Sequence, residues 1–343
     1  QILLFGVFRP AIYAIYVLTI ALLFYIASSK MLDESILLDT GIIVIFYAYI
    51  EKLYTPIQQL AEQFNVLQSA LAAAERVYEV INTKPEIVDE LDAIDIDQLK
   101  GEIEFKHVWF SYIENEWILK DVSFKVNAKE NVAFVGATGS GKTTILSLIV
   151  RNYDIQKGQI LIDGQDIKHY KIASLRKCIG QMLQDVFLFS GTIRSNICLR
   201  DETISNETIE ASCKFVNADK IIDKLPQKLE EPVLERGKNF SSGERQLISF
   251  ARVVSHKPSV MILDEATSNI DTETEALIQD SLKKMMNIGT MLIVAHRLST
   301  IQHCDKIIVL KKGVIIEEGN HKELLALKGY YYNLYRLQYE HDA

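Results

Sequence analysis

The sequence has no excess of basic residues and few cysteines. Of its 343 residues, 37 are Lys or Arg and 45 are Asp or Glu, which gives a formal net charge of −8. This balance argues against a nucleic-acid-binding surface, which needs clustered positive charge. The cysteines are widely spaced and form no CxxC pair, so they indicate reduced cytosolic thiols rather than a zinc site or disulfide framework: Cys178, Cys198, Cys213 and Cys304.

Charge is absent altogether from Pro10 to Ser29. As a helix this stretch would be about 30 Å long, the thickness of the hydrocarbon core of a bilayer. It predicts a transmembrane helix, with a buried core helix as the open alternative. A signal peptide fits poorly, because the apolar run is too long and no small-residue cleavage pattern follows. The chain begins at Gln1 inside an apolar run, so we expect an N-terminal portion before it.

A second apolar run, Gly41 to Ile50, is too short to span a bilayer by itself. Apolar residues continue after it at spacings of four and three, which predicts one stripe along a long helix: Leu53, Ile57, Leu60, Phe64, Leu67, Leu71, Ala74, Tyr78 and Ile81. We expect this helix to enter the bilayer near Gly41, to continue into the cytosol and to pack its stripe on neighbouring helices. A soluble coiled-coil arm would explain the stripe but not the uncharged run before it. Lys84-Pro85 should end the helix.

From Glu102 the pattern changes to short apolar strands alternating with helical segments, which predicts a mostly parallel sheet covered on both faces. The expected strands are 102–109, 122–126, 131–135, 159–162, 260–263, 291–294 and 306–310. The predicted organisation is therefore a helical membrane part over residues 1–82, an acidic linker over 83–100 and an α/β domain over 101–343.

The glycine-rich segment Gly136–Thr143, hereafter the phosphate loop, lies between a predicted strand and a predicted helix. Glycines let the backbone wrap so that several N–H groups point at one anion, and the helix directs its positive end at the same point. Lys142 can reach the β- and γ-phosphates of a nucleotide, and the Thr143 hydroxyl can ligate Mg²⁺. This strand-loop-helix context distinguishes the segment from a glycine-rich turn without a ligand.

Two further segments carry polar groups at places where such a domain binds ligands. The strand 260–263 ends in Asp264 and Glu265, which would hold Mg²⁺ and polarise an attacking water, although a solvated acidic strand end is a common alternative. Ser241 and Glu244 have capping-box spacing before the helical run 247–254. A helix N-terminus that faces an anion fits the same spacing, and both can hold at once.

Taken singly, Gln184, Tyr112 and His296 are unremarkable. The joint order of the phosphate loop, Phe240–Glu244, the strand that ends in Asp264-Glu265, and His296 resembles the ATP-binding-cassette (ABC) exporter family. The resemblance covers essentially the whole chain. It implies the last two transmembrane helices of a half-transporter followed by an α/β nucleotide-binding domain with a mostly parallel sheet and a helical subdomain. It also implies ATP hydrolysis that drives export of drugs, lipids or other amphipathic substrates.

The resemblance also implies roles for individual residues, with ATP and Mg²⁺ as ligands. Tyr112 would stack on adenine, Gln184 would reach Mg²⁺ and the attacking water, and His296 would contact the γ-phosphate. Ser268-Asn269-Ile270-Asp271 resembles a loop that couples two ATP sites, and Glu235-Arg236-Gly237 an exporter-specific contact across subunits. The expected site residues are, for catalysis, Glu265, His296 and Gln184; for nucleotide binding, Tyr112, Gly136, Thr138, Gly139, Ser140, Gly141, Lys142, Thr143, Thr144, Ser241 and Gly243; and for the metal, Thr143, Gln184 and Asp264.

In this family two nucleotide-binding domains close head to tail, each ATP lying between one phosphate loop and the signature helix of the other subunit. The implied partners are a second half-transporter subunit, the lipid bilayer and an amphipathic substrate, with no nucleic acid. The implied location is the plasma or inner membrane, with the nucleotide-binding domain in the cytoplasm. The usual signature Leu-Ser-Gly-Gly-Gln is Phe240-Ser241-Ser242-Gly243-Glu244 here, which suggests the catalytic-glutamate subunit of a heterodimer. Four transmembrane helices of the family pattern and both docking loops are absent from this sequence.

Two other function classes compete with an exporter. A soluble ABC-type ATPase that acts on nucleic acid or protein conflicts with the uncharged run Pro10 to Ser29 and the absence of a basic face. An ABC-fold channel or regulator that gates without pumping conflicts with the presence of Glu265.

Overall fold

Two long helices make up the first part of the chain in this computed structural model, which describes residues 2–31, 39–201, 203–264, 271–294 and 298–341. Helix α1 is Ile2–Met31 and α2 is Thr40–Asn82. The side chain of Asp39 accepts a hydrogen bond from the Gly41 amide at 3.1 Å and so caps the start of α2. The two helices contact each other, with the Thr19 hydroxyl and the Tyr54 hydroxyl 3.1 Å apart.

Within the described residues, one helical stretch is long and apolar enough to cross a membrane. It is Pro10–Lys30, 21 residues with a mean hydropathy of 2.1, within α1. Helix α2 does not meet the same criterion, because its apolar run ends at Ile50 and is followed by Glu51 and Lys52. The second predicted crossing, from Gly41, stays a prediction.

Helix α2 runs through Pro56 and ends at Asn82, before Lys84-Pro85. Its apolar stripe is exposed, with Leu60 73%, Leu71 60% and Ile81 75% accessible. Soluble monomers rarely leave such a continuous apolar surface open to water.

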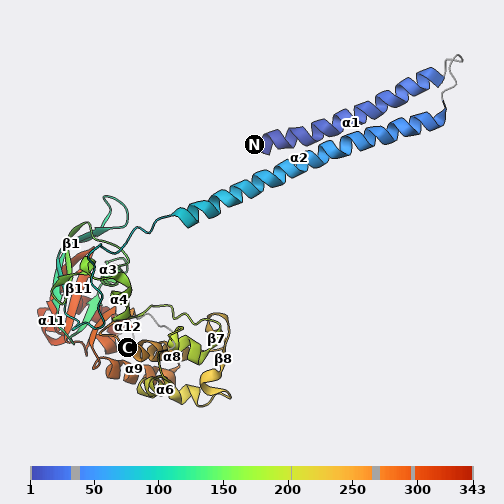
Figure 1. Cartoon of the computed structure of the whole chain (residues 1–343). Helices are drawn as coiled ribbons and strands as arrows, with labels where there is room; N and C mark the ends of the chain where they lie inside the picture. Colours follow the sequence, from blue (N-terminus) through green and yellow to red (C-terminus); the bar gives the residue numbers. More distant parts are fainter. Residues whose placement is uncertain (1, 32–38, 202, 265–270, 295–297, 342–343) are drawn as a thin grey trace. The chain divides into compact units, whose positions relative to one another are not determined.

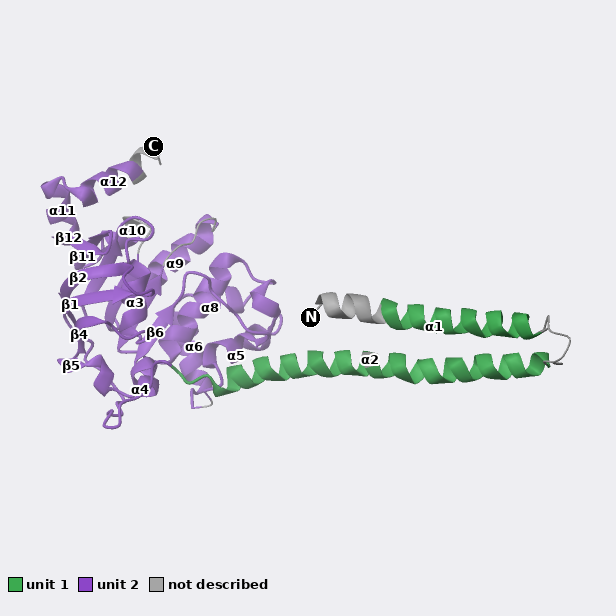
Figure 2. Cartoon of the chain, turned by 90° about the horizontal axis from the view of Figure 1, so that it is seen from above, with its two compact units in different colours: residues 1–85 green, residues 86–343 purple. Residues whose placement is uncertain are grey.

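A six-stranded sheet is the centre of the second part of the chain, which forms a compact unit over residues 86–343, separate from the unit 1–85 (Figure 2). Its strand order is β12-β11-β3-β10-β9-β6. The five strands from β11 to β6 are parallel to their neighbours, and β12 is antiparallel to β11. The strands are β3 Asn131–Val135, β6 Ile179–Met182, β9 Val260–Asp264, β10 Thr290–Val294, β11 Lys306–Lys311 and β12 Val314–Gly319. The prediction of a mostly parallel sheet is confirmed.

A second, antiparallel sheet contains the remaining longer strands. Its order is β2-β1-β4-β5, with β1 Ile103–Ser111, β2 Trp117–Val126, β4 Lys157–Ile162 and β5 Gln165–Asp166. The expected strands at 102–109, 122–126 and 159–162 therefore do not join the parallel sheet. The connection from β1 to β2 is too short for a crossover, so these strands must pair antiparallel.

Helices and short strands fill the rest of this unit (Figure 1). The helices are α3 Lys142–Ile149, α4 Ile172–Lys177, α5 Ile193–Cys198, α6 Asn206–Phe215, α7 Asp219–Ile222, α8 Ser242–Ser255, α9 Thr272–Met285, α10 Leu298–Ile301, α11 His321–Leu327 and α12 Tyr330–His341, with 3₁₀ turns at Ile167–His169, Lys228–Glu230 and Glu235–Gly237. Strands β7 Gly191–Thr192 and β8 Pro232–Val233 pair with each other.

The parallel sheet separates two apolar cores. Ala133, on β3, faces the core that includes α8, whereas its neighbours Val132 and Phe134 face the core that includes α3 and the antiparallel sheet. All three side chains are fully buried. Side chains alternate across a strand, so a strand covered on both faces must be apolar throughout, as this one is. Burying each large apolar side chain contributes about 1.5–3 kcal/mol, which fixes the edge of the sheet from which the phosphate loop emerges.

Candidate nucleotide site

The carboxyl ends of the parallel strands meet at one edge of the sheet and bring the predicted site residues together. The phosphate loop follows β3, Asp264 is the last residue of β9, and Gln184 comes two residues after β6. Val294, the last residue of β10, pairs directly with Asp264. Ligands of open α/β sheets bind outside this edge.

Within the phosphate loop, two glycines have no room for a side chain. A Cβ atom at Gly136 would lie 2.2 Å from the carbonyl oxygen of Leu310, and one at Gly141 would lie 2.7 Å from Leu119 Cδ2. Gly141 also has a left-handed backbone, with φ of 105°, and is the N-cap of α3. The close approach of the neighbouring strands therefore determines the loop's shape.

The Lys142 side chain is held inside the phosphate loop. Its ammonium group donates to the carbonyl oxygens of Gly136 at 2.8 Å and Ala137 at 3.1 Å. Burial lowers the pKa of Lys142, and the nearby Asp264 carboxylate opposes that shift. A buried cation with two neutral acceptors is well placed to exchange them for phosphate oxygens, which bind it more strongly.

Oxygen donors suited to a magnesium ion lie next to this lysine. The Thr143 hydroxyl donates to Asp264 Oδ2 at 3.3 Å, which joins the start of α3 to the end of β9. Mg²⁺ prefers a small number of protein oxygen ligands together with phosphate and water oxygens. The hydroxyl and the carboxylate fit that requirement.

Near the start of α3, Tyr112 is held in place through its hydroxyl group and its ring. Its hydroxyl donates to Thr144 Oγ1 at 3.2 Å, and its ring packs edge-on against Phe110 and Tyr153. The Tyr112 side chain is half exposed. These contacts fix the position of an aromatic ring beside the start of α3.

A cavity of about 400 Å³ joins these groups. It is lined by Tyr112, Ile118, Thr138, Gly139, Gly141, Lys142, Thr143, Thr144, Gln184, Asp264 and Val294. Sequence reasoning missed Ile118 and Val294. Ile118 was missed because β2 begins five residues earlier than predicted, and Val294 because nothing distinguishes it from the other apolar residues of β10.

Two other phosphate-loop predictions concern residues outside this lining. Gly136 contacts Lys142 through its carbonyl group. The Ser140 hydroxyl oxygen is buried and is one of the polar side-chain atoms that lack a hydrogen-bond partner within the described structure. An unpaired buried hydroxyl is costly, so this position favours a ligand or water that supplies the missing partner.

Ser241 and Gly243 do not line this cavity. They lie at the start of α8, where the Ser241 hydroxyl accepts from the Glu244 amide at 3.2 Å and the Glu244 carboxylate accepts from the Ser241 amide at 2.7 Å. The capping box is therefore present. Glu265, His296 and residues 268–270 lie outside the described residues.

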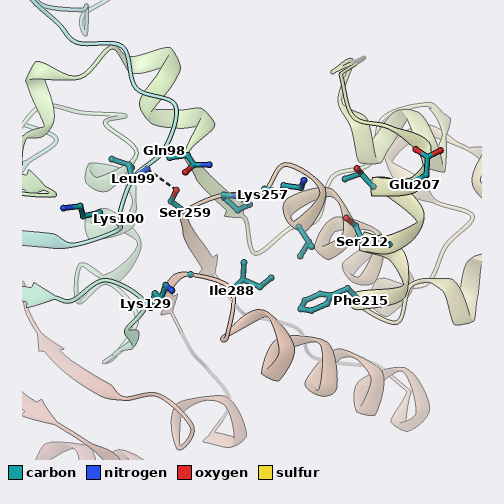
Figure 3. A pocket seen from close by; sticks show the side chains of 15 residues that line it. Gln98, Leu99, Lys100, Lys129, Glu207, Ser212, Phe215, Lys257, Ser259 and Ile288 are labelled. Atoms are coloured by element: carbon teal, nitrogen blue, oxygen red, sulfur yellow. Dashed lines mark hydrogen bonds between the residues drawn. The ribbon is translucent and has the colours of Figure 1, made fainter.

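A larger cavity of about 650 Å³ lies elsewhere in the same unit (Figure 3). Lys129, Ser259 and Gly289, which precede strands β3, β9 and β10, line it together with residues of α6. It is thus at the amino ends of the parallel strands, opposite the edge that carries the phosphate loop. Its size does not make it the nucleotide site, because none of the predicted phosphate-binding side chains lines it.

Comparison with known proteins shows which proteins this chain resembles. Residues 119–268 match the family described as ABC transporter. A Bacillus subtilis protein described as a probable multidrug resistance ABC transporter ATP-binding/permease protein is 46% identical over 307 residues, which is 90% of this chain and 45% of the relative. An ATP-dependent lipid A-core flippase of Syntrophus aciditrophicus is 42% identical over 290 residues, 84% of this chain and 48% of the relative.

The solved structures give the same result for the fold. A bacterial Atm1-family ABC exporter with ATP bound superposes with a TM-score of 0.73 at 36% identity, covering 88% of this chain and 53% of that one. The predicted fold class, an ABC-type α/β domain preceded by helices, is confirmed. The chain spans about half the length of the curated relatives it matches.

Proposed function

We propose that this chain, of which residues 119–268 match the ABC transporter family, binds and hydrolyses ATP as a subunit of a membrane exporter. The observation that carries the proposal is the single cavity that joins Lys142, Thr143, Gln184, Asp264 and Tyr112. These residues come from four separate segments of the chain, and each offers a group that one part of Mg²⁺-ATP requires.

In this proposal the phosphate loop binds the triphosphate. Main-chain amides of residues 136–144 and the start of α3 face the anion, and Lys142 neutralises its β- and γ-phosphates. The adenine stacks on Tyr112, a contact worth about 1–3 kcal/mol per base in nucleic-acid complexes. Such stacking adds affinity without demanding one particular base.

Mg²⁺ would be held by Thr143, Asp264 and Gln184, and when bound it neutralises charge that develops on the phosphate oxygens. Glu265 would polarise the attacking water and His296 would contact the γ-phosphate. These two roles follow from the family resemblance and from the place of both residues in the sequence, after β9 and β10. The chain's own contribution is to position water and phosphate and to exclude other water.

We place the signature segment of this chain, with Ser241 and Gly243, on the ATP of a second subunit. The Glu244 carboxylate caps α8, so its negative charge occupies the helix end that would face that ATP. This arrangement supports a heterodimer in which this chain supplies Glu265 and its partner's own site is the weaker one. To test it, Glu265→Gln is made in the full complex and ATP turnover is measured. Substantial residual turnover would count against the heterodimer.

The membrane part of the proposal rests on the two helices. The 21-residue stretch in α1 has the length and hydropathy of a spanning helix, and the exposed stripe of α2 needs apolar neighbours. We propose that both helices lie among other transmembrane helices, that the nucleotide-binding domain is cytoplasmic, and that the transported substrate is amphipathic. Two relatives are described as a lipid A-core flippase and a fatty acid ABC transporter, which fits this substrate class.

Nucleotide binding is the direct test. The chain, purified in detergent, is titrated with a fluorescent ATP analogue in the presence of Mg²⁺. Lys142→Met should weaken binding at least about tenfold, because a charge-assisted hydrogen bond to phosphate contributes about 1.5–3 kcal/mol. Lys257→Met, at an exposed lysine that lines the other cavity, is the matched control and should bind as the unchanged chain does. Equal affinities for the two variants would refute the site.

A further inference from the structure

Residues 86–101, hereafter the strap, lie between the end of α2 and β1. They form hydrogen bonds with the rest of the second unit. The Ile94 amide donates to the His169 carbonyl at 2.7 Å, and the Lys171 amide donates back to the Ile94 carbonyl at 2.9 Å. The Asp89 carboxylate accepts from the Ile172 amide at 2.8 Å. The strap is therefore part of the domain's hydrogen-bonded structure and is not a flexible linker.

A further hydrogen bond of the strap involves Arg151, at the end of the phosphate-loop helix α3. Arg151 lies just after α3, in a left-handed conformation with φ of 50°, and only 2% of it is exposed. Its guanidinium group donates to the Val88 carbonyl of the strap at 3.2 Å and to the Lys168 carbonyl at 3.2 Å. It also donates to the Asp154 carboxylate at 3.2 Å. One buried side chain thus joins the end of α3 to the strap.

Other hydrogen bonds of the strap involve the strands that end at the nucleotide site. The Leu99 amide donates to Ser259 Oγ at 3.1 Å, the contact drawn as a dashed line in Figure 3. Ser259 directly precedes β9, whose last residue is Asp264. The Thr290 hydroxyl, at the start of β10, donates to the Gly101 carbonyl at 2.8 Å. The strap therefore contacts three elements whose opposite ends line the nucleotide cavity.

We propose that Arg151 is a positioning residue that makes the strap a mechanical connection between the nucleotide cavity and α2. The proposal rests on the proposed function in so far as ATP occupies that cavity. Packed interiors are stiff and transmit small displacements instead of absorbing them. A shift of α3 when phosphate enters the loop would move the buried guanidinium and, through the Val88 carbonyl, the strap. Helix α2 ends at Asn82, so the covalent path from the strap to this helix is short.

The test uses hydrogen exchange on the purified full chain in detergent, with and without a non-hydrolysable ATP analogue and Mg²⁺. In the unchanged chain, bound nucleotide should slow exchange of the Ile94 amide at least about fivefold, although this amide lies outside the nucleotide cavity. Arg151→Lys keeps the charge but replaces the planar, five-donor guanidinium by a compact ammonium, which cannot span the Val88 carbonyl, the Lys168 carbonyl and the Asp154 carboxylate in the same geometry. It should reduce the slowing to less than about twofold while nucleotide affinity stays within about threefold.

Arg176→Lys is the matched control. Arg176 donates to the carbonyl groups of Val150 at 3.1 Å and Arg151 at 2.9 Å, so it holds the same turn, but no hydrogen bond from it to the strap is present in the described structure. This variant should keep the nucleotide-dependent slowing at Ile94. Loss of the slowing in both variants would overturn the proposal, because general loosening of the turn would then explain it.

Two results separate this inference from the proposed function. If the unchanged chain does not bind nucleotide, the proposed function is refuted. Binding without any change at Ile94 refutes the inference alone. If Arg151→Lys lowers the melting temperature by more than about 5 °C, Asp154→Ala takes its place, because it removes the carboxylate that orients Arg151 and leaves the buried arginine present. It should weaken the slowing at least about twofold, and unchanged slowing would overturn the proposal.

Discussion

Replacing Gly141 by alanine tests whether the phosphate loop is shaped by its packing against β2. The new Cβ would lie 2.7 Å from Leu119 Cδ2, and Leu119 is fully buried. Moving a packed side chain costs about 1–3 kcal/mol. The left-handed backbone, with φ of 105°, adds about 1–2 kcal/mol for a residue with a side chain. Gly141→Ala should therefore lower the free energy of unfolding by about 2–5 kcal/mol.

Gly139→Ala is the matched comparison within the same loop. Gly139 also has a positive φ, 77°, but apart from Gly139 and its two chain neighbours no atom of the described structure lies within 4 Å of a Cβ built there. Only the backbone cost applies, about 1–2 kcal/mol. The difference between the two variants, about 1–3 kcal/mol, isolates the contact with Leu119.

Tryptophan fluorescence measures this difference without interference from the membrane helices. The chain has 2 tryptophans, Trp109 on β1 and Trp117 on β2, with ring centroids 5.4 Å apart. Both report on the antiparallel sheet that carries Leu119. Unfolding in denaturant, followed by this signal, gives the free energy for each variant. Equal stabilities of the two variants would refute the reasoning, because the steric contact would then contribute nothing.

Three further predictions follow from the charges and thiols of the second unit. ATP affinity should fall as pH rises through the lowered pKa of Lys142, because phosphate binds the charged form of this lysine. Lys142→Arg should show no such fall, and titrations of ATP affinity at increasing pH check this difference. Asp264→Asn should weaken binding of Mg²⁺-ATP more than binding of ATP in EDTA, measured by calorimetry, and equal losses would exclude a metal role. Burial, and to a smaller extent nearby carboxylates, raises the pKa of Cys213 to about 12. Iodoacetamide at pH 8 should therefore leave this thiol unmodified in the native chain and modify it in denaturant. Peptide mass spectrometry measures the extent of modification.

The sequence alone determined the kind of fold and predicted the class of site within it. A phosphate loop between an apolar strand and a helix has few other uses, and the alternation of strands and helices requires a mostly parallel sheet. Asp264 was predictable as well, because the last residue of a parallel strand lies at the ligand edge. The fold and the position of Asp264 at a strand end were predictable because they depend on local order along the chain and on the period of side-chain burial.

Tertiary structure decided what lies beside these residues. The pattern did not show that β1, β2, β4 and β5 form a separate antiparallel sheet, because pairing depends on connection length and on contacts far apart in sequence. Nor did it show that Ile118 joins the nucleotide cavity or that Arg151 binds the Val88 carbonyl. Residues 88 and 151 are 63 positions apart. Only the packing of the strap against the end of α3 brings the Val88 carbonyl and the Arg151 side chain together. No local periodicity encodes such a contact.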